Sequence, residues 1–343
     1  MVLYNPNISQ NLSIYGIQIP IYENRVKKII ENLLSDPFLD KHKNLWLVSD
    51  IKANIAKTDL ERVHSRHYID KLYSDKLEQE IIKTFELITD KGQYNRYNPD
   101  EAKQGPKTLF FQILKKIEGT YYCCQLSLQN GFCFFCGGGM HHAKKDYGEG
   151  FCLLNDLVIA VRKLQFNHKI KTAWIIDLDA HKGDGTACLT ESDQNIITLS
   201  IHMAKGWPLD FTGPANNERQ KAYHIPNNID IPVESNENRD YNLKLEQGMA
   251  RLSHYPLADI AIVVDGADPW EKDELKSTEL MSLNLKQLFK RDKFVYRYLK
   301  KLNIPVAYVM AGGYGKEPWK VYTQFLNWAL KDHLNEKLTK YHS

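Results

Sequence analysis

The sequence predicts an α/β protein with a mainly parallel sheet and helices on both of its faces. After residue 130, short apolar runs recur along the chain and helical stretches fall between several of them. The runs do not alternate strictly between polar and apolar residues, so each strand is expected to be buried on both faces, as in a parallel sheet. Repetition of strand and helix is typical of such a sheet.

The first 130 residues show mostly helical patterns, with apolar side chains three and four positions apart. Asp36-Pro37 is expected to end the first helix, and Asp59 is the predicted cap of the second. A polar stretch rich in Tyr, Asn and Gly between 90 and 106 predicts a surface loop. The helices predicted in this part cover 22–34, 59–72 and 108–128.

The rest of the chain supplies the strands. No Ser-, Gly- or Pro-rich linker and no repeat interrupts the sequence, so we expect one domain over residues 1–343 with its motif-bearing core at about 60–320. The predicted strands cover 132–136, 172–178, 196–201, 260–264 and 306–310, and the predicted helices between them cover 155–165, 238–252 and 282–302.

Composition excludes several classes of protein. Of the 343 residues, 43% are hydrophobic, which is too many for a disordered chain. The 45 Lys and Arg residues nearly balance the 42 Asp and Glu residues, so we expect no direct binding to nucleic acid or to a membrane surface. No apolar run approaches the roughly 20 residues that span a bilayer. The first residues lack the pattern of a signal peptide, so we expect a cytoplasmic protein, with a nuclear location left open for a eukaryotic cell or a secreted effector.

The cysteines predict neither a disulfide framework nor a zinc finger. Six cysteines in so long a chain are unlike a small secreted domain stabilised by disulfides. Cys133-Phe-Phe-Cys136 has the CxxC spacing, but no second pair follows at the distance that a zinc finger requires. Because its centre is apolar, we predict that this run is a buried strand.

Titratable residues gather where the predicted strands end. Ligands bind beyond the carboxyl ends of strands in open α/β sheets, so these positions are the candidates for a site. Four of the five strand ends combine Asp, His or Tyr with glycine. The runs after the five strands are Gly137–His142, Asp177–Gly185, Ser200–His202, Asp265–Asp268 and Ala311–Tyr314.

Asp177-x-Asp179-x-His181 is the most informative of these runs. Extended chain alternates faces with a period of two, so the three side chains are expected to point to the same side. Two carboxylates and an imidazole would titrate abnormally unless a cation joined them. Oxygen and nitrogen ligands without a thiolate suit Zn²⁺, Fe²⁺ or Mn²⁺. Asp268, which follows another strand, is the candidate for the last ligand. The alternative interpretation of the motif is an Asp–His pair that only stabilises a loop.

His141, His142 and Tyr314 are candidates for catalytic groups. The triple glycine before His141 lets the backbone approach a substrate and present both imidazoles. Two histidines near a metal can provide a general base and an electrostatic partner. Tyr314 follows Gly312-Gly313 and could donate a hydrogen bond to a developing oxyanion.

Together these segments resemble the zinc-dependent histone deacetylase family of the arginase–deacetylase superfamily. They come in the family's order and at family-like spacing over about residues 60–320. The stretch Ile176–His181 and the pair Arg291-Asp292 are most similar to class IV members and their bacterial relatives. The matching runs are Val63–Ile69, Gly137–Ala143, Gly150–Asp156, Asp177–Gly185, Asp265–Asp268 and Gly312–Tyr314.

The resemblance implies a single domain around an eight-stranded, mainly parallel sheet. It also implies hydrolysis of an N-acyl amide, most simply the acetyl group on a lysine side chain of a protein or peptide. A zinc ion, or Fe²⁺, would be held by Asp179, His181 and Asp268. His142 would act as general base and then as acid, with His141 as its electrostatic partner.

Further roles are implied by the same resemblance. Asp177 would orient His141, and Asp184 would orient His142. Gly150 and Phe151 would line an acyl-lysine tunnel. A structural potassium ion is also implied, and the residues expected around it are Asp177, Asp179, His181 and the backbone of Ser200 and Ile201.

Two positions depart from the family pattern, and three other functions are alternatives to lysine deacetylation. Lys182 stands where His or Gln is usual, and Asp265 where Asn or Ser is more familiar. The main alternative is a deacetylase for small molecules such as acetylated polyamines, which calls for an acidic mouth to which Asp146, Glu149 and Asp210 could contribute. A non-catalytic acyl-lysine-binding protein is less favoured because no ligand is missing. Gly183 disfavours an arginase-like pair of manganese ions, which needs Asp at that position.

Overall fold

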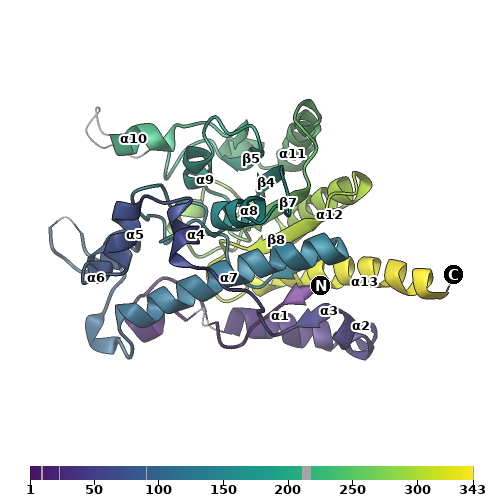
Figure 1. The fold of residues 1–343 in the computed structure, drawn as a ribbon, viewed down its shortest axis with the longest axis horizontal. Coiled ribbons are helices and arrows are strands. Elements are labelled where there is room, and N and C mark those ends of the chain that lie inside the picture. The colour runs from purple at the N-terminus through teal and green to yellow at the C-terminus, as the bar shows by residue number, and fades with distance from the viewer. Residues whose placement is uncertain (9–10, 23, 90, 211–217, 343) are drawn as a thin grey trace.

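The computed structural model describes residues 1–8, 11–22, 24–89, 91–210 and 218–342. Its eight strands form one sheet in the order β2-β1-β3-β8-β7-β4-β5-β6, and every pair of neighbouring strands is parallel (Figure 1). This confirms the predicted fold class. The strands are β1 Val2–Leu3, β2 Leu47–Val48, β3 Phe132–Phe135, β4 Ala173–Asp177, β5 Ile196–Met203, β6 Ile229–Val233, β7 Ile260–Asp265 and β8 Val306–Met310.

Helices cover both faces of the sheet. Those before β3 are α1 Asn24–Leu34, α2 Pro37–Lys41, α3 Lys43–Trp46, α4 Lys57–Glu61, α5 Arg66–Leu72, α6 Leu77–Thr84 and α7 Pro106–Asn130. Those after β3 are α8 Asp156–Phe166, α9 Asp184–Leu189, α10 Glu218–Tyr223, α11 Tyr241–Ala250, α12 Leu285–Lys301 and α13 Trp319–His342. None of the described helices is long and apolar enough to cross a membrane.

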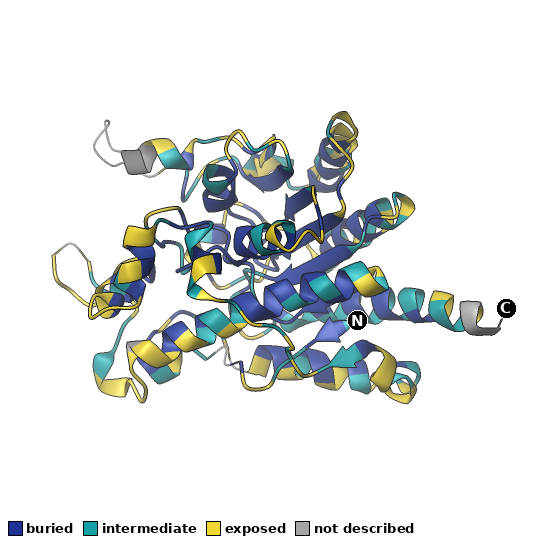
Figure 2. Cartoon of the chain, in the orientation of Figure 1, coloured by how far each residue is buried: buried dark blue, intermediate teal, exposed yellow. Residues whose placement is uncertain are grey.

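The strands supply two apolar cores because their side chains alternate between the two faces of the sheet. In β4, Trp174 and Ile176 join the core that includes α1, α11, α12 and α13. Ala173 and Ile175 join the core that includes α5 to α8. Figure 2 shows the central strands in the dark blue of buried residues, with exposed residues on the outer sides of the helices.

The predicted helix positions are close for α1, α7, α8 and α12. Side-chain caps fix two of these starts, because Asn155 accepts a hydrogen bond from the Val158 N–H and Asn284 accepts one from the Gln287 N–H. The end of α7 is set by Gly131, whose φ of 82° is costly for other residues. The predicted helix over 238–252 is shorter as α11, with a 3₁₀ turn on each side.

The prediction of one helix over 59–72 is wrong, because the segment forms α4 and α5. Asp59 does not cap from outside the helix; it lies in the first turn of α4, where its carboxylate accepts the N–H of Ala56. Ser65 caps α5 by accepting the Tyr68 N–H. A cap in the middle of the segment divides it, and spacing of apolar residues alone does not show this.

The sequence analysis did not predict the strands β1, β2 and β6 or the helices α2, α3, α6, α9, α10 and α13. Both β1 and β2 have two residues, which is too short for a periodic pattern. The edge strand β6 alternates buried Ile and Val with the more exposed Asp230 and Pro232, unlike the fully apolar central strands.

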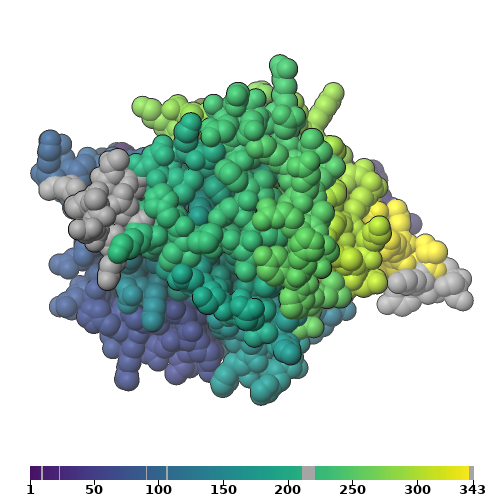
Figure 3. Space-filling model, turned by 90° about the horizontal axis from the view of Figure 1, so that it is seen from above, coloured from purple at the N-terminus to yellow at the C-terminus, as the bar shows by residue number. Residues whose placement is uncertain are grey.

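All strands are parallel, so their carboxyl ends meet at one edge of the sheet. In the strand order, β3, β8, β7 and β4 are consecutive neighbours, and these are the strands followed by the candidate site residues. The sheet therefore brings together four segments that are far apart in sequence. Seen from above, the surface is formed largely by the middle of the chain, drawn in teal to green in Figure 3.

Candidate metal centre and active-site cavity

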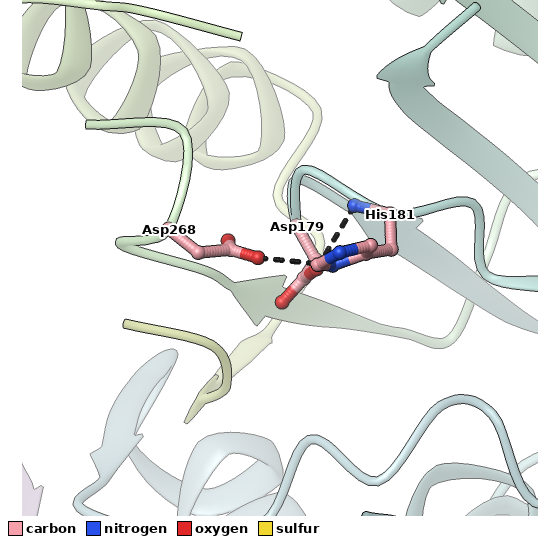
Figure 4. Close-up of side chains that lie close together, drawn as sticks. All are labelled: Asp179, His181 and Asp268. Atoms are coloured by element: carbon pink, nitrogen blue, oxygen red, sulfur yellow. Dashed lines mark hydrogen bonds and ion pairs between the residues drawn. The ribbon is translucent and has the colours of Figure 1, made fainter. Parts of the chain in front are cut away.

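Asp179, His181 and Asp268 converge as a buried cluster at the edge of the sheet. Asp179 and His181 follow β4, and Asp268 follows the neighbouring β7. One potential ligand atom from each side chain lies within 4.8 Å of the others. His181 Nδ1 lies 3.1 Å from Asp179 Oδ1 and 3.2 Å from Asp268 Oδ2. Figure 4 shows the three side chains close together.

The donor set of this cluster fits a divalent cation. Asp268 Oδ2 is buried, and its contact among the described residues is the ion pair with His181 Nδ1 rather than a hydrogen bond. Burial and the charge of Asp179 raise the pKa of Asp268 well above its usual value, as expected for carboxylates that lack a cation. A Cβ built on Gly312 would lie 2.5 Å from Asp179 Oδ2 and 2.7 Å from Asp268 Oδ2, so a side chain there would occupy the space beside the ligands. Oxygen and nitrogen donors of this kind suit Zn²⁺ or Fe²⁺.

Two carboxylate–imidazole pairs lie beside the cluster. His141 Nδ1 is 2.6 Å from Asp177 Oδ2, and His142 Nδ1 is 2.6 Å from Asp184 Oδ1. The resemblance to the deacetylase family implied these two pairs. Each carboxylate fixes the orientation of its ring and the tautomer, so that Nε2 points away from the carboxylate.

The two histidines differ in charge. Burial lowers the pKa of His141, but the charges of Asp177 and Asp179 outweigh this effect and raise the pKa to about 9. Burial and the neighbouring charge of His141 lower the pKa of His142 to about 3. At neutral pH, His142 is therefore the imidazole that is free to accept a proton.

Lys144 extends the His142–Asp184 pair into a buried ionic cluster. The Lys144 ammonium contacts the carboxylates of both Asp184 and Glu149, and the Tyr223 hydroxyl donates to Glu149 over 2.7 Å. All four residues are buried. Lys144 thus neutralises two carboxylates. Asp184 orients His142, and Glu149 directly precedes Gly150.

Replacing Lys144 by methionine is expected to destabilise the fold by about 3–5 kcal/mol, because it leaves two buried carboxylates without their cation. Chemical denaturation followed by circular dichroism measures the loss. The double variant Lys144→Met/Glu149→Gln has the same net charge as the wild type in this cluster and should recover part of it. Equal stability of the wild type and Lys144→Met would show that the ion cluster does not form.

His64 links the two ends of the segment 144–155, which carries Gly150 and Phe151. Its Nδ1 lies 2.7 Å from the Lys144 carbonyl oxygen, and its Nε2 accepts the Asn155 N–H over 3.0 Å. This pattern requires a neutral ring that donates from Nδ1. Burial lowers the pKa of His64 to about 4.

Stability is expected to fall as the pH drops from about 6.5 to about 4, because the unfolded chain binds a proton on His64 in this range and the folded chain does not. The low pKa of His64 in the folded protein means that its neutral ring stabilises the fold fully above about pH 6.5. The free energy of unfolding of the wild type and His64→Gln, measured between pH 7 and 4, gives the contribution of His64. Identical pH slopes for the two proteins would contradict the assignment.

A cavity of about 260 Å³ contains the candidate active site. It is lined by His141, His142, Asp179 and His181, and also by Phe151 and Tyr314, whose ring centroids are 6.3 Å apart. Burial and the charges of Asp179 and Asp268 raise the pKa of Tyr314 well above its usual value, so its hydroxyl stays protonated and can donate. Gly150 and Phe151 both line the cavity, as the predicted tunnel requires.

Trp207 was not identified from the sequence. Its ring centroid lies 4.5 Å from that of His142 and 5.6 Å from that of His181, so it forms a wall beside both. A Cβ on Gly150 would come within 2.4 Å of the Trp207 ring, so glycine is needed at that position. Trp207 lies four residues beyond the end of β5, so its position after a strand is the signal that marks it in the sequence.

The remaining predicted residues lie outside the cavity. Ser200 pairs with Asp177 between β5 and β4, and its hydroxyl accepts the Gly183 N–H. Ile201 pairs with Ile231 in β6. The predicted potassium site at Asp177, Ser200 and Ile201 stays a prediction.

The two departures from the family pattern have partners away from the metal cluster. The Lys182 ammonium donates to the Ile225 carbonyl and lies 3.4 Å from Asp230. Asp265 accepts a hydrogen bond from Arg291 at 2.7 Å, and both are fully buried. Neither substitution therefore removes a ligand or a catalytic candidate.

The fold and the site define the class: a protein of the α/β class with a candidate metal centre at the carboxyl ends of the strands of a parallel sheet. The histone deacetylase domain model matches residues 19–328. The chain therefore belongs to the histone deacetylase family, within the arginase–deacetylase superfamily, and is a deacetylase-type amidohydrolase.

Individual relatives agree with this membership. The chain is 24% identical to histone deacetylase 2 of Arabidopsis thaliana over 315 residues, covering 91% of this chain and 74% of that protein. It is 30% identical to the acetoin utilization protein AcuC of Staphylococcus aureus over 190 residues, which are 54% of this chain and 46% of that protein.

The solved structures agree in fold. The HDA15 HD domain superposes with a TM-score of 0.66 at 18% identity, covering 98% of this chain and 89% of that one. An acetylpolyamine aminohydrolase from Burkholderia pseudomallei superposes with a TM-score of 0.68 at 14% identity, covering 95% and 97%.

Proposed function

We propose that this protein removes acetyl or longer acyl groups from lysine side chains of proteins or peptides, with zinc held by Asp179, His181 and Asp268. The observation that carries the proposal is the convergence of this ligand cluster with the His142–Asp184 pair and Tyr314 around one cavity. Fe²⁺ suits the same donors and is the alternative metal.

A metal bound at this cluster would polarise the amide carbonyl and make water more acidic. The protein's own groups supply proton transfer and orientation. His142 accepts the proton of the attacking water at Nε2 and returns it to the leaving lysine nitrogen, while Asp184 keeps the ring in place. His141, paired with Asp177, adds positive charge beside the reaction.

Tyr314→Phe is expected to lower kcat by about 10²–10³, because the carbonyl oxygen gains negative charge in the transition state and the phenol can donate to it there. KM should change less, since the hydrogen bond strengthens as the charge develops. Steady-state kinetics on an acetyl-lysine peptide, with metal content measured on the same sample, checks this. A wild-type kcat in Tyr314→Phe would remove the hydroxyl from the mechanism.

The charges of the cavity do not favour a polycationic substrate. Glu149 is buried against Lys144, and neither Asp146 nor Asp210 is among the described residues that line the cavity, so the acidic mouth considered from the sequence is not formed by them. Apart from Asp179, the carboxylate among the described lining residues is Glu86, which lies 3.6 Å from Arg96. An acylated polyamine would bring further positive charge to a lining that already contains Arg25, Arg96 and Lys116.

Assays with an acetyl-lysine peptide and an acetylated polyamine, with metal analysis of the same preparation, test the proposal. We expect hydrolysis of the peptide and loss of activity with a chelator. A higher kcat/KM for the polyamine would replace the proposed substrate class, and a metal-loaded protein inactive on both would overturn the proposed function. We place the activity in the cytoplasm, where the free thiol state of the six cysteines is usual, and we expect no nucleic acid or membrane partner.

A further inference from the structure

Arg291 of α12 contacts the backbone just before the candidate metal ligands on two neighbouring strands. Leu178 is the first residue after β4 and directly precedes Asp179. Gly266 is the first residue after β7 and lies two positions before Asp268. Arg291 Nη1 donates to both backbone carbonyl oxygens, over 3.1 Å to Leu178 and over 2.8 Å to Gly266. One guanidinium group therefore bridges the two segments that carry the ligands.

Two carboxylates fix the orientation of this guanidinium group. Asp292, the next residue of α12, accepts a hydrogen bond from Arg291 Nε over 2.6 Å, and Asp265 at the end of β7 accepts one from Nη2 over 2.7 Å. All three side chains are fully buried. Because Nε and Nη2 are engaged by the carboxylates, Nη1 is directed at the two carbonyl oxygens. Asp265, which departs from the family pattern, thus serves as a partner of Arg291.

The two ligand segments lie in close contact beside Arg291. A Cβ built on Gly266 would lie 2.7 Å from Asp179 Cα and 2.6 Å from Asp268 Oδ1, so the segments touch at this residue. The N–H of Ala180 also joins them, because it donates to Asp268 Oδ1 over 3.1 Å. A shift of one backbone segment against the other therefore changes the distance between the carboxylates of Asp179 and Asp268.

We infer that Arg291 is a positioning residue for the metal site, because it fixes the spacing of the two ligand segments and thereby raises the affinity for the metal. The inference rests on the proposed metal site at Asp179, His181 and Asp268, and Arg291 acts on it through the backbone. Loss of a group that orients metal ligands typically lowers metal affinity by about 10- to 100-fold. An ion pair that only stabilised α12 would change the free energy of unfolding and leave the metal affinity as it is.

The test measures the Zn²⁺ affinity of the full chain by competition with a chelator, and the visible absorption of the Co²⁺-loaded protein, which depends on the geometry of the ligands. Arg291→Lys keeps the charge, but an ammonium group cannot reproduce the planar set of donors. Arg291→Gln removes the charge, and either variant alone suffices for the comparison. The controls are Asp292→Asn, which leaves the bonds from Nη1 to the backbone in place, and Val295→Ala, which removes buried packing one turn further along α12.

We expect both Arg291 variants to bind Zn²⁺ about 10- to 100-fold more weakly than the wild type and to give an altered Co²⁺ spectrum. Arg291→Gln separates positioning from charge, because removal of a nearby positive charge would by itself strengthen the binding of a cation. Asp292→Asn and Val295→Ala should keep the wild-type affinity and spectrum even where their melting temperatures fall. All affinities are measured well below the melting temperature of the least stable variant, so that unfolding does not contribute.

Three outcomes would overturn the inference. Wild-type Zn²⁺ affinity in either Arg291 variant shows that the guanidinium group does not fix the ligands. An equal loss of affinity in Val295→Ala shows that metal binding follows the stability of α12 rather than the contacts of Arg291. A wild type that binds no divalent metal overturns the proposed metal site as well, whereas a wild type that binds Zn²⁺ no better than its Arg291 variants overturns this inference alone.

Discussion

Asp268→Asn is expected to abolish both metal binding and hydrolysis. The side chain keeps its size but loses the charged oxygen that lies 3.2 Å from His181 Nδ1, so two protein ligands, Asp179 and His181, remain. Loss of one of three protein ligands leaves too little coordination to hold a divalent ion tightly. Metal analysis after gel filtration and the rate of acetyl-lysine hydrolysis give the two readouts.

Without metal, Asp268→Asn should not be less stable than the wild type. Asp179 and Asp268 raise the free energy of the empty site because both carboxylates are buried together. Metal-free Asp268→Asn should therefore be at least as stable as the metal-free wild type, whereas the metal-loaded wild type should be the most stable form. Asp146→Asn, which removes an exposed carboxylate, serves as the control. A full complement of metal in Asp268→Asn would show that the ligand assignment is wrong.

His142→Ala should lower kcat by about 10²–10⁴, the usual effect of losing a general acid–base group. His142 is the neutral member of the histidine pair and is oriented by Asp184. We therefore expect no neighbouring group to take over its proton transfer. Metal content should stay at the wild-type level, since His142 is outside the ligand cluster. Single-turnover kinetics on an acetyl-lysine peptide measures the chemical step directly.

His141→Ala is the matched comparison. His141 has a pKa raised to about 9 and contributes charge more than proton transfer, so its loss should lower kcat less than the loss of His142. A larger defect in His141→Ala than in His142→Ala would exchange the two roles. Equal defects would show that the histidines act as one unit.

Much of the fold could be predicted from local patterns. The apolar runs at β3, β4, β7 and β8 were identified because central parallel strands are buried on both faces and need no polar residues. Where an element is short or lies at an edge, as in β1 and β6, this signal is absent. The division between α4 and α5 depends on the Ser65 cap, which lies within an apparently continuous helical pattern.

The candidate ligands and catalytic groups were also identifiable from sequence, because each follows a strand and strand ends meet at one edge in a parallel sheet. Trp207 and Lys144 were not identified. Trp207 becomes part of the site because the chain beyond β5 brings its ring against His142. Lys144 could not be identified because a lysine in a polar segment is ordinarily exposed. Its acidic partners, Glu149 and Asp184, also come from different parts of the chain.

By itself, the sequence predicted the class of fold and the candidate metal-ligand residues, since these depend on residue type and on position after a strand. The resemblance to the deacetylase family added the two carboxylate–imidazole pairs. Only the tertiary structure decided what surrounds them. Arg25 and Lys116 lie on different helices, and neither has a local pattern that marks it as part of a site. They meet in one cavity because α1 and α7 both pack at the site, and packing between distant helices is a property of the whole fold rather than of any segment.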